Sequence, residues 1–402
     1  MPGSDRGPDR RRFIKQTLQT AGLVSLGTTL TGAMGVSRRL DFERLKNLGG
    51  LQKPDALGVR LLPGFRCRLL ARSGRPVLME NGRPSSYIWH HAPDGGACFP
   101  GEDGGWIYVS NSEVTDAGGA GAIRFNRRGG VKTAYSILKG TSRNCSGGPT
   151  PWGTWLSCEE TETGQVYECD VHGGGARVRP ALGRFRHEAV AIDPQRRQAY
   201  LTEDKGDGCL YRFTAEAGRE RPMDLDRGVL EVALMDDSGR ISWRKIPDPV
   251  PGPGAVPVRL QVEEASRFPG AEGIWFHRDK VVFACKGDNR VWELDVPTSQ
   301  IQIIYDGDRL TDPVLSGVDN LCVSDNGQVV VAEDGDDMQV VMLGPNGEAL
   351  PLLQVVDQDH SEITGPAISP DGRRLYFSSQ RGGPRKRGLT YEVSGPFGFT
   401  VA

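Results

Sequence analysis

Thr154-Trp-Leu-Ser-Cys-Glu-Glu160 is an apolar strand that ends in acidic residues, and the chain carries six stretches of this form. The stretches align on Tyr108, Trp155, Tyr200, Val282, Val330 and Tyr376. The steps between them are 47, 45, 82, 48 and 46 residues. A propeller blade takes about 40–50 residues and contributes strands in every unit. The sequence therefore predicts an all-β fold, a six-bladed β-propeller.

Tight turns precede most of these strands, as in Asp325-Asn-Gly327 and Pro370-Asp-Gly372. Asn-Gly and Asp-Gly between apolar runs form hairpin turns, because glycine takes positive φ without a Cβ penalty. Each unit is therefore expected to contain an inner strand, a turn and a second strand. In such a hairpin the start of the inner strand and the end of the second strand lie at the same end of the channel.

This alignment predicts a ring of carboxylates and a thiol at one channel mouth. Expected at the starts of the inner strands are Cys98, Cys145, Glu188, Glu272, Asp319 with Asn320, and Pro366. Expected at the ends of the second strands are Glu159, Glu160, Glu203, Asp204, Asp288, Glu333 and Asp334.

The composition fits one large repeat domain. The 402 residues include 54 glycines and 27 prolines, which suits many turns and few long helices, and a net charge of −2 gives no basic field for nucleic acid. We expect a signal region at 1–36, a lead-in at 37–85, the propeller at 86–395 and a tail at 396–402. The step of 82 residues between Tyr200 and Val282 predicts an insertion around 215–268. We interpret this insertion as a surface loop or a substrate-facing lid.

The N-terminus carries a targeting signal. Arg10-Arg-Arg-Phe-Ile-Lys15 precedes an uncharged, weakly apolar stretch from Thr17 to Val36. Paired arginines followed by Phe-Ile-Lys fit the twin-arginine export signal, and the stretch is too polar for a stable membrane anchor. The sequence predicts a periplasmic or secreted protein whose partner is the twin-arginine export machinery.

Eight cysteines are scattered without a CxxC motif, an even number that permits disulfides in an exported protein. Cys158, Cys285 and Cys322 lie on or at the ends of apolar strands and are expected to be buried. Cys145 differs, because it lies in a polar, glycine-rich turn where a thiol can be exposed and ionised.

The motif around Cys145 resembles the signature of the PhoX family of alkaline phosphatases, which are twin-arginine-exported bacterial enzymes. It runs Thr141-Ser-Arg-Asn-Cys-Ser-Gly-Gly-Pro-Thr-Pro-Trp-Gly-Thr-Trp-Leu-Ser-Cys-Glu-Glu-Thr161. The resemblance continues through 183–190, 200–207, 272–276, 319–321 and 364–372, and so covers nearly the whole repeat region.

The resemblance implies a cluster of iron and calcium ions in the channel. Cys145 would ligate iron, and Glu160, Glu188, Glu272 and Asp319 would bind or bridge the metals as the catalytic centre. A thiolate with carboxylates suits iron, and oxygen ligands suit calcium. One thiolate and four carboxylates would carry −5 when ionised, a charge that destabilises the fold unless cations neutralise it.

The activity implied is metal-assisted hydrolysis of a small-molecule phosphate monoester. Asn144, Lys205, Lys286 and Arg381 are the candidates for holding the substrate. One departure concerns the fourth motif, where the family pattern has Arg-Pro before Glu-Gly and this chain has Gly270-Ala271. Because that arginine contacts phosphate in the family, we expect weaker phosphate binding here.

Two other functions remain open on the sequence. A calcium-dependent lactonase on a six-bladed propeller would use Glu188, Glu272 and Asn320, but has no use for Cys145 or Glu159-Glu160. A non-catalytic periplasmic binding propeller is the other alternative, because a fold does not imply a function and the expected arginine is missing.

Overall fold

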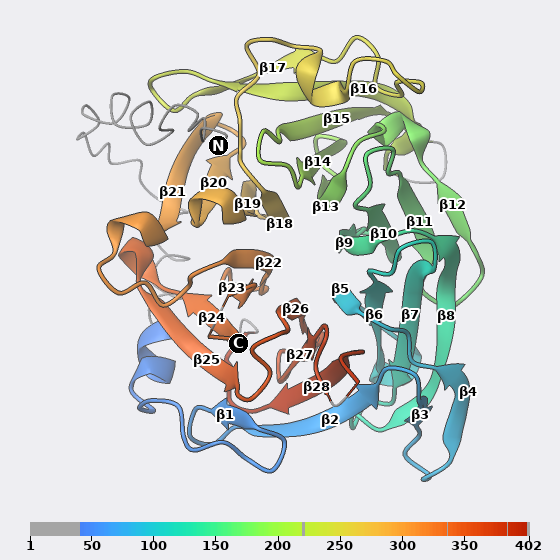
Figure 1. Ribbon diagram of the computed structural model, residues 1–402, viewed down its shortest axis with the longest axis vertical. Helices are drawn as coiled ribbons and strands as arrows, with labels where there is room; N and C mark the ends of the chain where they lie inside the picture. The colour runs from blue at the N-terminus through green and yellow to red at the C-terminus, as the bar shows by residue number, and fades with distance from the viewer. Residues whose placement is uncertain (1–40, 219–221, 336, 384, 400–402) are drawn as a thin grey trace, which may run out of the picture.

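The computed structural model describes residues 41–218, 222–335, 337–383 and 385–399, which form a six-bladed β-propeller (Figure 1). Each blade is an antiparallel sheet whose innermost strand faces the central channel. The inner strands are β5 (Pro93–Pro100), β9 (Asn144–Pro149), β13 (His187–Asp193), β18 (Ala271–His277), β22 (Val318–Val323) and β26 (Ile363–Ile368). The fold predicted from the repeat is therefore confirmed.

The second strand of each blade is one of the six apolar stretches read from the sequence. These are β6 (Trp106–Ser112), β10 (Thr154–Glu159), β14 (Gln198–Glu203), β19 (Lys280–Cys285), β23 (Val329–Glu333) and β27 (Arg374–Ser379). Their side chains are buried on both faces because each sheet packs between two neighbouring blades. This explains why the stretches read as continuous apolar runs rather than alternating patterns.

Outer strands complete the blades. The third strands are β7 (Gly118–Phe125), β11 (Val166–Asp170), β15 (Leu210–Glu216), β20 (Arg290–Asp295), β24 (Gln339–Leu343) and β28 (Leu389–Ser394). The fourth strands in blades 1 to 5 are β8 (Val131–Thr141), β12 (Ala176–Val178), β16 (Asp224–Met235), β21 (Gln300–Asp306) and β25 (Ala349–Val355). The third blade has a fifth strand, β17 (Ile241–Lys245), which lies in the segment expected as an insertion.

Two strands that precede the first blade in the sequence close the ring. β2 (Arg66–Arg72) pairs with β28 as the fourth strand of the sixth blade, and β1 (Val59–Leu61) pairs with β25 in the fifth blade. The segment 37–85, expected as a lead-in, thus supplies strands to two blades and a hairpin of β3 (Pro76–Leu78) with β4 (Pro84–Ile88). Closure joins the last blade to the first part of the chain and fixes the channel geometry, and the inner edge of each sheet is protected inside the channel.

Apolar layers between neighbouring sheets form the core. Val282 and Ala284 of β19 belong to one buried cluster with Val329 and Val331 of β23. Cys158, Cys285 and Cys322 are buried in such layers as predicted, and all eight cysteines are free thiols. No helix among the described residues is long and apolar enough to cross a membrane.

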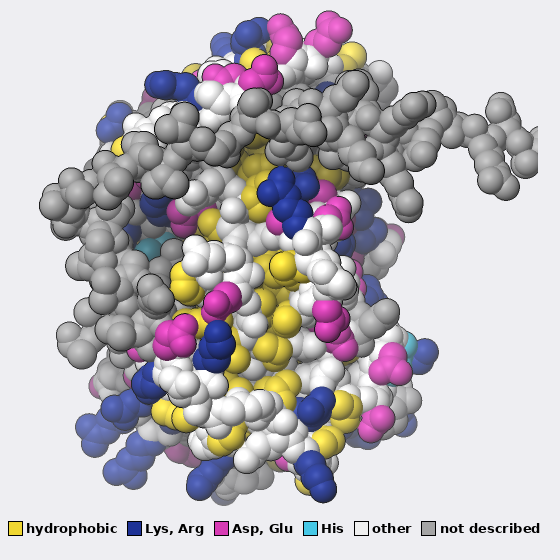
Figure 2. All heavy atoms as spheres, turned by 90° about the vertical axis from the view of Figure 1, so that its left-hand side faces the viewer, with side chains coloured by type: hydrophobic (Ala, Val, Ile, Leu, Met, Phe, Trp, Pro, Cys, Tyr) yellow, Lys and Arg dark blue, Asp and Glu magenta, His cyan; other side chains and the backbone are white. Residues whose placement is uncertain are grey.

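The outer side of the molecule also carries apolar side chains, visible as a band in Figure 2. A groove of about 590 Å³ lies between β21 and the turn after β24, lined in part by Ile303, Ile304, Leu343 and Pro345. Its lining contains none of the acidic residues of the channel, so we look for the functional site in the channel instead.

Candidate metal centre in the propeller channel

A β-bulge at the start of every blade decides which side chains enter the channel. Each inner strand makes a first pair with the end of its second strand, and the register then shifts. These pairs are Pro93–Ser112, Asn144–Glu159, His187–Glu203, Ala271–Cys285, Val318–Glu333 and Ile363–Ser379. In the sixth blade a second pair, Thr364–Ser378, precedes the shift. A bulge re-aims the side chain next to it, so the residue after each first pair occupies an equivalent place in all six blades.

Three rings of equivalent residues follow from these pairs. The bulge ring comes directly after the inner member of each pair: Asp94, Cys145, Glu188, Glu272, Asp319 and Thr364. The exit ring comes directly after the outer member: Glu113, Glu160, Asp204, Lys286, Asp334 and Gln380. The entry ring comes directly before the inner member: Ala92, Arg143, Arg186, Gly270, Gly317 and Glu362.

Backbone hydrogen bonds tie two of these rings together. In five blades the exit-ring N–H donates to the entry-ring carbonyl at 2.7–3.0 Å, from Glu160 to Arg143 and from Lys286 to Gly270, for example. The repeat therefore fixes a bulge-ring side chain and two flanking side chains per blade at one channel mouth.

Three groups of ligand atoms lie in this mouth, each with all its atoms within 4.8 Å of one another. They are Cys145, Glu160 and Glu188; Glu188, Glu272 and Asp319; and Asp319, Asp334 and Glu362. Glu188 and Asp319 each belong to two groups, so the groups form one continuous set. The structure thus brings together all five residues expected from the sequence as metal ligands.

Glu188 is the residue of this set whose charge is least compensated by the surrounding protein. Its side chain is fully buried on β13, and neither carboxylate oxygen has a hydrogen-bond partner among the described residues. Burial raises its pKa well above the usual value, and the charges of Glu272, Glu160 and Asp319 add to the shift. A buried, unpaired carboxylate is costly unless a proton or a metal ion neutralises it, so the donor set fits a bound cation.

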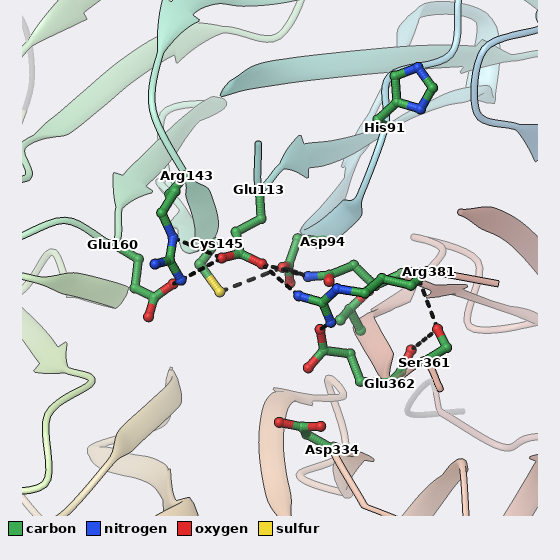
Figure 3. Close-up of polar contacts among 12 residues, drawn as sticks. His91, Asp94, Glu113, Arg143, Cys145, Glu160, Asp334, Ser361, Glu362 and Arg381 are labelled. Carbon is green, nitrogen blue, oxygen red and sulfur yellow. Dashed lines mark hydrogen bonds and ion pairs between the residues drawn. The ribbon is translucent and has the colours of Figure 1, made fainter. Parts of the chain in front are cut away.

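Cys145 lies at the edge of the acidic set, with its Sγ 3.5 Å from Asp94 Oδ2 (Figure 3). Burial raises the pKa of the thiol, and the carboxylates of Asp94, Glu188 and Glu160 raise it further. Asp94 is itself held by Gln380, whose Nε2 donates to Oδ2 at 2.5 Å. Only a nearby cation would favour the thiolate in these surroundings.

Other carboxyls of the mouth also bind protons more tightly than usual. Burial raises the pKa of Glu362 to about 8 and that of Asp319 to about 6. Burial and the charge of Asp319 raise the pKa of Glu272. Without metal ions the mouth therefore holds several protons near neutral pH.

Four basic side chains lie among these acids. Arg143 Nη2 is 2.8 Å from Glu113 Oε1 and 2.7 Å from Glu160 Oε2, and Arg186 pairs with Glu160 and Asp204. Lys286 Nζ is 2.8 Å from Glu272 Oε1 and 3.1 Å from Asp334 Oδ2. Arg381 pairs with Glu362 and lies 3.5 Å from Glu113 Oε2 (Figure 3). These cations neutralise only part of the acidic set, which has nine carboxylates: Asp94, Glu113, Glu160, Glu188, Asp204, Glu272, Asp319, Asp334 and Glu362.

The four residues expected to hold substrate fall into two kinds. Lys286 and Arg381 lie at the mouth. Asn144 does not face the channel, because its buried amide donates to Ser157 Oγ at 3.0 Å and accepts from Thr141 Oγ1 at 2.5 Å. Lys205 lies outside the acidic set, with its Nζ 2.7 Å from Glu162 Oε1. Asn144 therefore holds the turn before Cys145, and Lys205 belongs to the outer rim.

The alignment of the sequence misplaced several ring members. Cys98 pairs with Tyr108 deep in blade 1, because the turn between β5 and β6 is longer and contains the 3-10 turn Glu102–Gly104. Asp94 occupies the bulge-ring position that was expected for Cys98, and Thr364 the one that was expected for Pro366. Lys286 occupies the exit-ring position that was expected for Asp288. Asp288 pairs instead with Arg290 at 3.2 Å.

Three further residues that were expected at the channel mouth do not face it, because side chains alternate along a strand. Glu159, Glu203 and Glu333 end their strands one residue before the exit ring, so their side chains point away from it. Glu159 accepts from the N–H of Ser142 and of Gln165, and Glu333 from the N–H of Ser316. Glu203 accepts from Tyr211 and Arg259. These carboxylates fix loops rather than line the channel.

Sequence reasoning missed Asp94, Glu113 and Glu362, together with Arg143 and Arg186. The arginines were within reach, since they stand in the motifs around Cys145 and Glu188, two residues before the bulge ring in consecutive blades. Glu113 and Glu362 gave no such signal, because only the pairing register reveals their equivalence to other ring members.

A comparison of the sequence with models of protein families finds a match. The family model described as alkaline phosphatase PhoX matches residues 115–180, 172–299 and 282–383. No curated protein sequence matches the chain.

Solved structures resemble the chain in fold alone. A Bacteroides thetaiotaomicron protein of unknown function is 11% identical, with a TM-score of 0.50 over 86% of this chain and 84% of that one. A Xanthomonas campestris gluconolactonase is 12% identical, with a TM-score of 0.47 over 87% and 98%. An Agrobacterium tumefaciens regucalcin, a calcium-binding protein, is 16% identical, with a TM-score of 0.42 over 83% and 96%.

Proposed function

The chain belongs to the alkaline phosphatase PhoX family, and from this premise we propose that it hydrolyses small-molecule phosphate monoesters at a metal centre in the propeller channel. The observation that carries the proposal is the fully buried Glu188, which has two unpartnered oxygens and lies between two groups of candidate ligands. Such a site is destabilising for a folded protein and becomes favourable when it holds cations.

We propose iron at the group that includes the thiol, Cys145, Glu160 and Glu188, and calcium at the groups made only of carboxylates. Softer thiolate ligation suits a transition metal, and flexible oxygen ligation suits calcium. When bound, the metals would supply charge neutralisation for a phosphoryl group and an activated oxygen nucleophile. Lys286 and Arg381 stand at the same mouth and would orient the phosphoryl oxygens from the solvent side.

The experiment is an assay of protein loaded with iron and calcium against a phosphomonoester and against a lactone. Phosphate release that disappears with a chelator supports the proposal. Opening of the lactone without phosphate release would favour a lactonase. Metal binding without either activity would favour a non-catalytic binding propeller. The environment of Asn320 favours neither alternative, since its side-chain oxygen already accepts from the N–H of Gly365 at 2.7 Å.

Gly270→Arg is expected to lower the Michaelis constant for a phosphomonoester about 10-fold. One charge-assisted hydrogen bond contributes about 1.5–3 kcal/mol, and Gly270 stands in the entry ring, where Arg143 already adopts φ +49° against +57° at Gly270. The left-handed backbone should cost about 1–2 kcal/mol of stability. Gly270→Ala is the control, because it adds this strain without the charge. An equal effect of both variants on the Michaelis constant would contradict the prediction.

Export by the twin-arginine pathway also remains a proposal, because residues 1–40 lie outside the described part of the structure. Arg10→Lys with Arg11→Lys should keep the protein in the cytoplasm, since the export receptor reads the arginine pair. Cell fractionation checks this, and undiminished accumulation of the double variant in the periplasm would refute the signal.

A further inference from the structure

Glu160 is enclosed by two guanidinium groups. Arg186 donates to Glu160 Oε1 from Nε at 2.8 Å and also from Nη2, while Arg143 Nη2 donates to Oε2 at 2.7 Å. The Glu160 side chain is 5% exposed, against 35% for Arg143 and 25% for Arg186. The two cations therefore cover a buried carboxylate from the solvent side.

The two arginines occupy equivalent positions in the entry ring of neighbouring blades, two residues before Cys145 and Glu188. Their guanidinium groups converge on the two oxygens of a single anion. This arrangement also suits the oxygens of a phosphoryl group, which guanidinium binds through paired hydrogen bonds. With Glu160 bound between them, an incoming anion would have to compete with an anion already held in place.

Glu160 is at the same time a member of the group with Cys145 and Glu188. Oε1 accepts two hydrogen bonds from Arg186, which engages both of its lone pairs. A cation bound to this oxygen must displace Arg186 and would also weaken the hold of Arg143 on Oε2 by withdrawing charge. Metal binding and arginine binding at Glu160 therefore compete.

We propose that Arg143 and Arg186 form an anion clamp for a phosphoryl group, which Glu160 holds closed until a metal ion takes this carboxylate. The inference rests on the proposed metal centre and adds an order of binding, metal first and phosphate second. Because binding free energies are linked, phosphate must in turn tighten metal binding by the same factor.

The direct test titrates inorganic phosphate by calorimetry into chelator-treated protein and into protein loaded with iron and calcium and freed of unbound metal. The loaded protein is expected to bind phosphate at least about 10-fold more tightly. Arg186→Gln should lower the phosphate affinity of the loaded protein about 10-fold, the effect of one hydrogen bond between charged groups. The same variant should raise iron affinity, measured by competition with a chelator, because a competitor for Glu160 is gone.

Arg212→Gln provides the control for loss of an ion-paired arginine. Arg212 pairs with Glu231 at 2.6 Å on β15 and β16, which are the third and fourth strands of their blade, away from the channel. It should leave both affinities unchanged. A purely structural role for Arg186 would lower the affinities for iron and phosphate together, and that result would overturn the clamp.

A second variant opens the clamp without removing either arginine. Glu160→Gln in metal-free protein should bind phosphate at least about 10-fold more tightly than the metal-free parent, since both arginines lose the carboxylate that they share. Arg143 keeps its ion pair with Glu113 and Arg186 its ion pair with Asp204, so both side chains stay in place at the mouth. Glu188→Gln is matched to it, because it removes one carboxylate from the same mouth but frees no arginine, and it should produce little change. Equal gains in both variants would mean that only net charge matters.

Failure of the clamp and failure of the proposed function give different results. A protein that hydrolyses phosphomonoesters but binds phosphate equally with and without metal refutes the clamp alone. A loaded protein that shows the opposite effects of Arg186→Gln on iron and phosphate, yet releases no phosphate from any ester, retains the clamp and refutes the hydrolase.

Discussion

Cys145→Ser is expected to remove iron and phosphatase activity together. Thiolate-to-iron charge transfer should colour the purified protein, and a serine hydroxyl cannot replace the thiolate as a ligand at neutral pH. Activity should fall by at least about 100-fold, since even residues behind the ligands change activity 10–100-fold in metal sites. Metal analysis, the visible spectrum and a phosphomonoester assay on the same preparation check the three losses.

Cys158→Ser is the matched control, because Cys158 lies on β10 two residues before Glu160 and its side chain is fully buried. Placing a hydroxyl there should cost about 1–3 kcal/mol of stability and leave colour, iron and activity in place. Full iron content and colour in Cys145→Ser would show that iron is bound by another set of residues. Loss of colour in both variants would point to a general disturbance of blade 2.

The fold could be predicted from the sequence because a propeller repeats one hydrophobic pattern. Trp155 of β10 and Val330 of β23 each stand near the start of a second strand that is buried between two blades, so the same apolar run recurs at blade spacing. The strands that close the ring were harder to see. Residues 66–72 pair with β28 across more than 300 positions of sequence, and nothing local in the segment marks that partner.

The candidate site could be predicted only where the turns have standard length. In blades 2 and 4 the distance of ten residues from the marker leads to Cys145 and Glu272, which the structure places in the bulge ring. In blade 1 the turn after β5 is longer, so counting ten residues back from Tyr108 leads to Cys98 instead of Asp94. Register, which decides ring membership, depends on turn geometry as well as on the apolar pattern.

The cations of the mouth could not be predicted as partners of the acids. Ion pairs such as Arg381 with Glu113 join blades 6 and 1, far apart in sequence, and their formation depends on the closed ring. Lys286 is instructive, because it holds the exit-ring position that carries a carboxylate in blades 1, 2, 3 and 5. A lysine in place of an acid is visible only after the blades have been superposed by their pairing.

The acidic mouth also predicts an unusual pH dependence for the metal-free protein. The pKa of Glu362 is raised to about 8, and that of Asp319 to about 6, first by burial, from ordinary values of 4.5 and 3.8. The folded protein therefore keeps protons that the unfolded chain releases. The stabilising effect of these protons is complete below about pH 4.5 and is lost as the pH rises toward 8, the opposite of the usual behaviour of paired carboxylates.

Metal-free protein should therefore lose on the order of 4 kcal/mol of unfolding free energy between pH 5 and pH 8, at up to about 1.4 kcal/mol per pH unit for each group. That is a large share of a typical domain stability of about 5–15 kcal/mol. Calcium should restore the loss increasingly as the pH rises, because it binds the ionised carboxylates and stabilises only the folded state.

Denaturant unfolding at pH 5 to 8, with chelator and with a calcium series, measures both effects. Glu362→Gln should flatten the pH dependence of the metal-free protein, since one of the proton-binding groups is gone. Glu216→Gln, which removes an exposed carboxylate at the outer end of β15, should leave it unchanged. A metal-free protein whose stability is flat or rises from pH 5 to 8 would mean that the buried carboxyls are already neutralised in another way, and the case for a metal centre would lose its energetic basis.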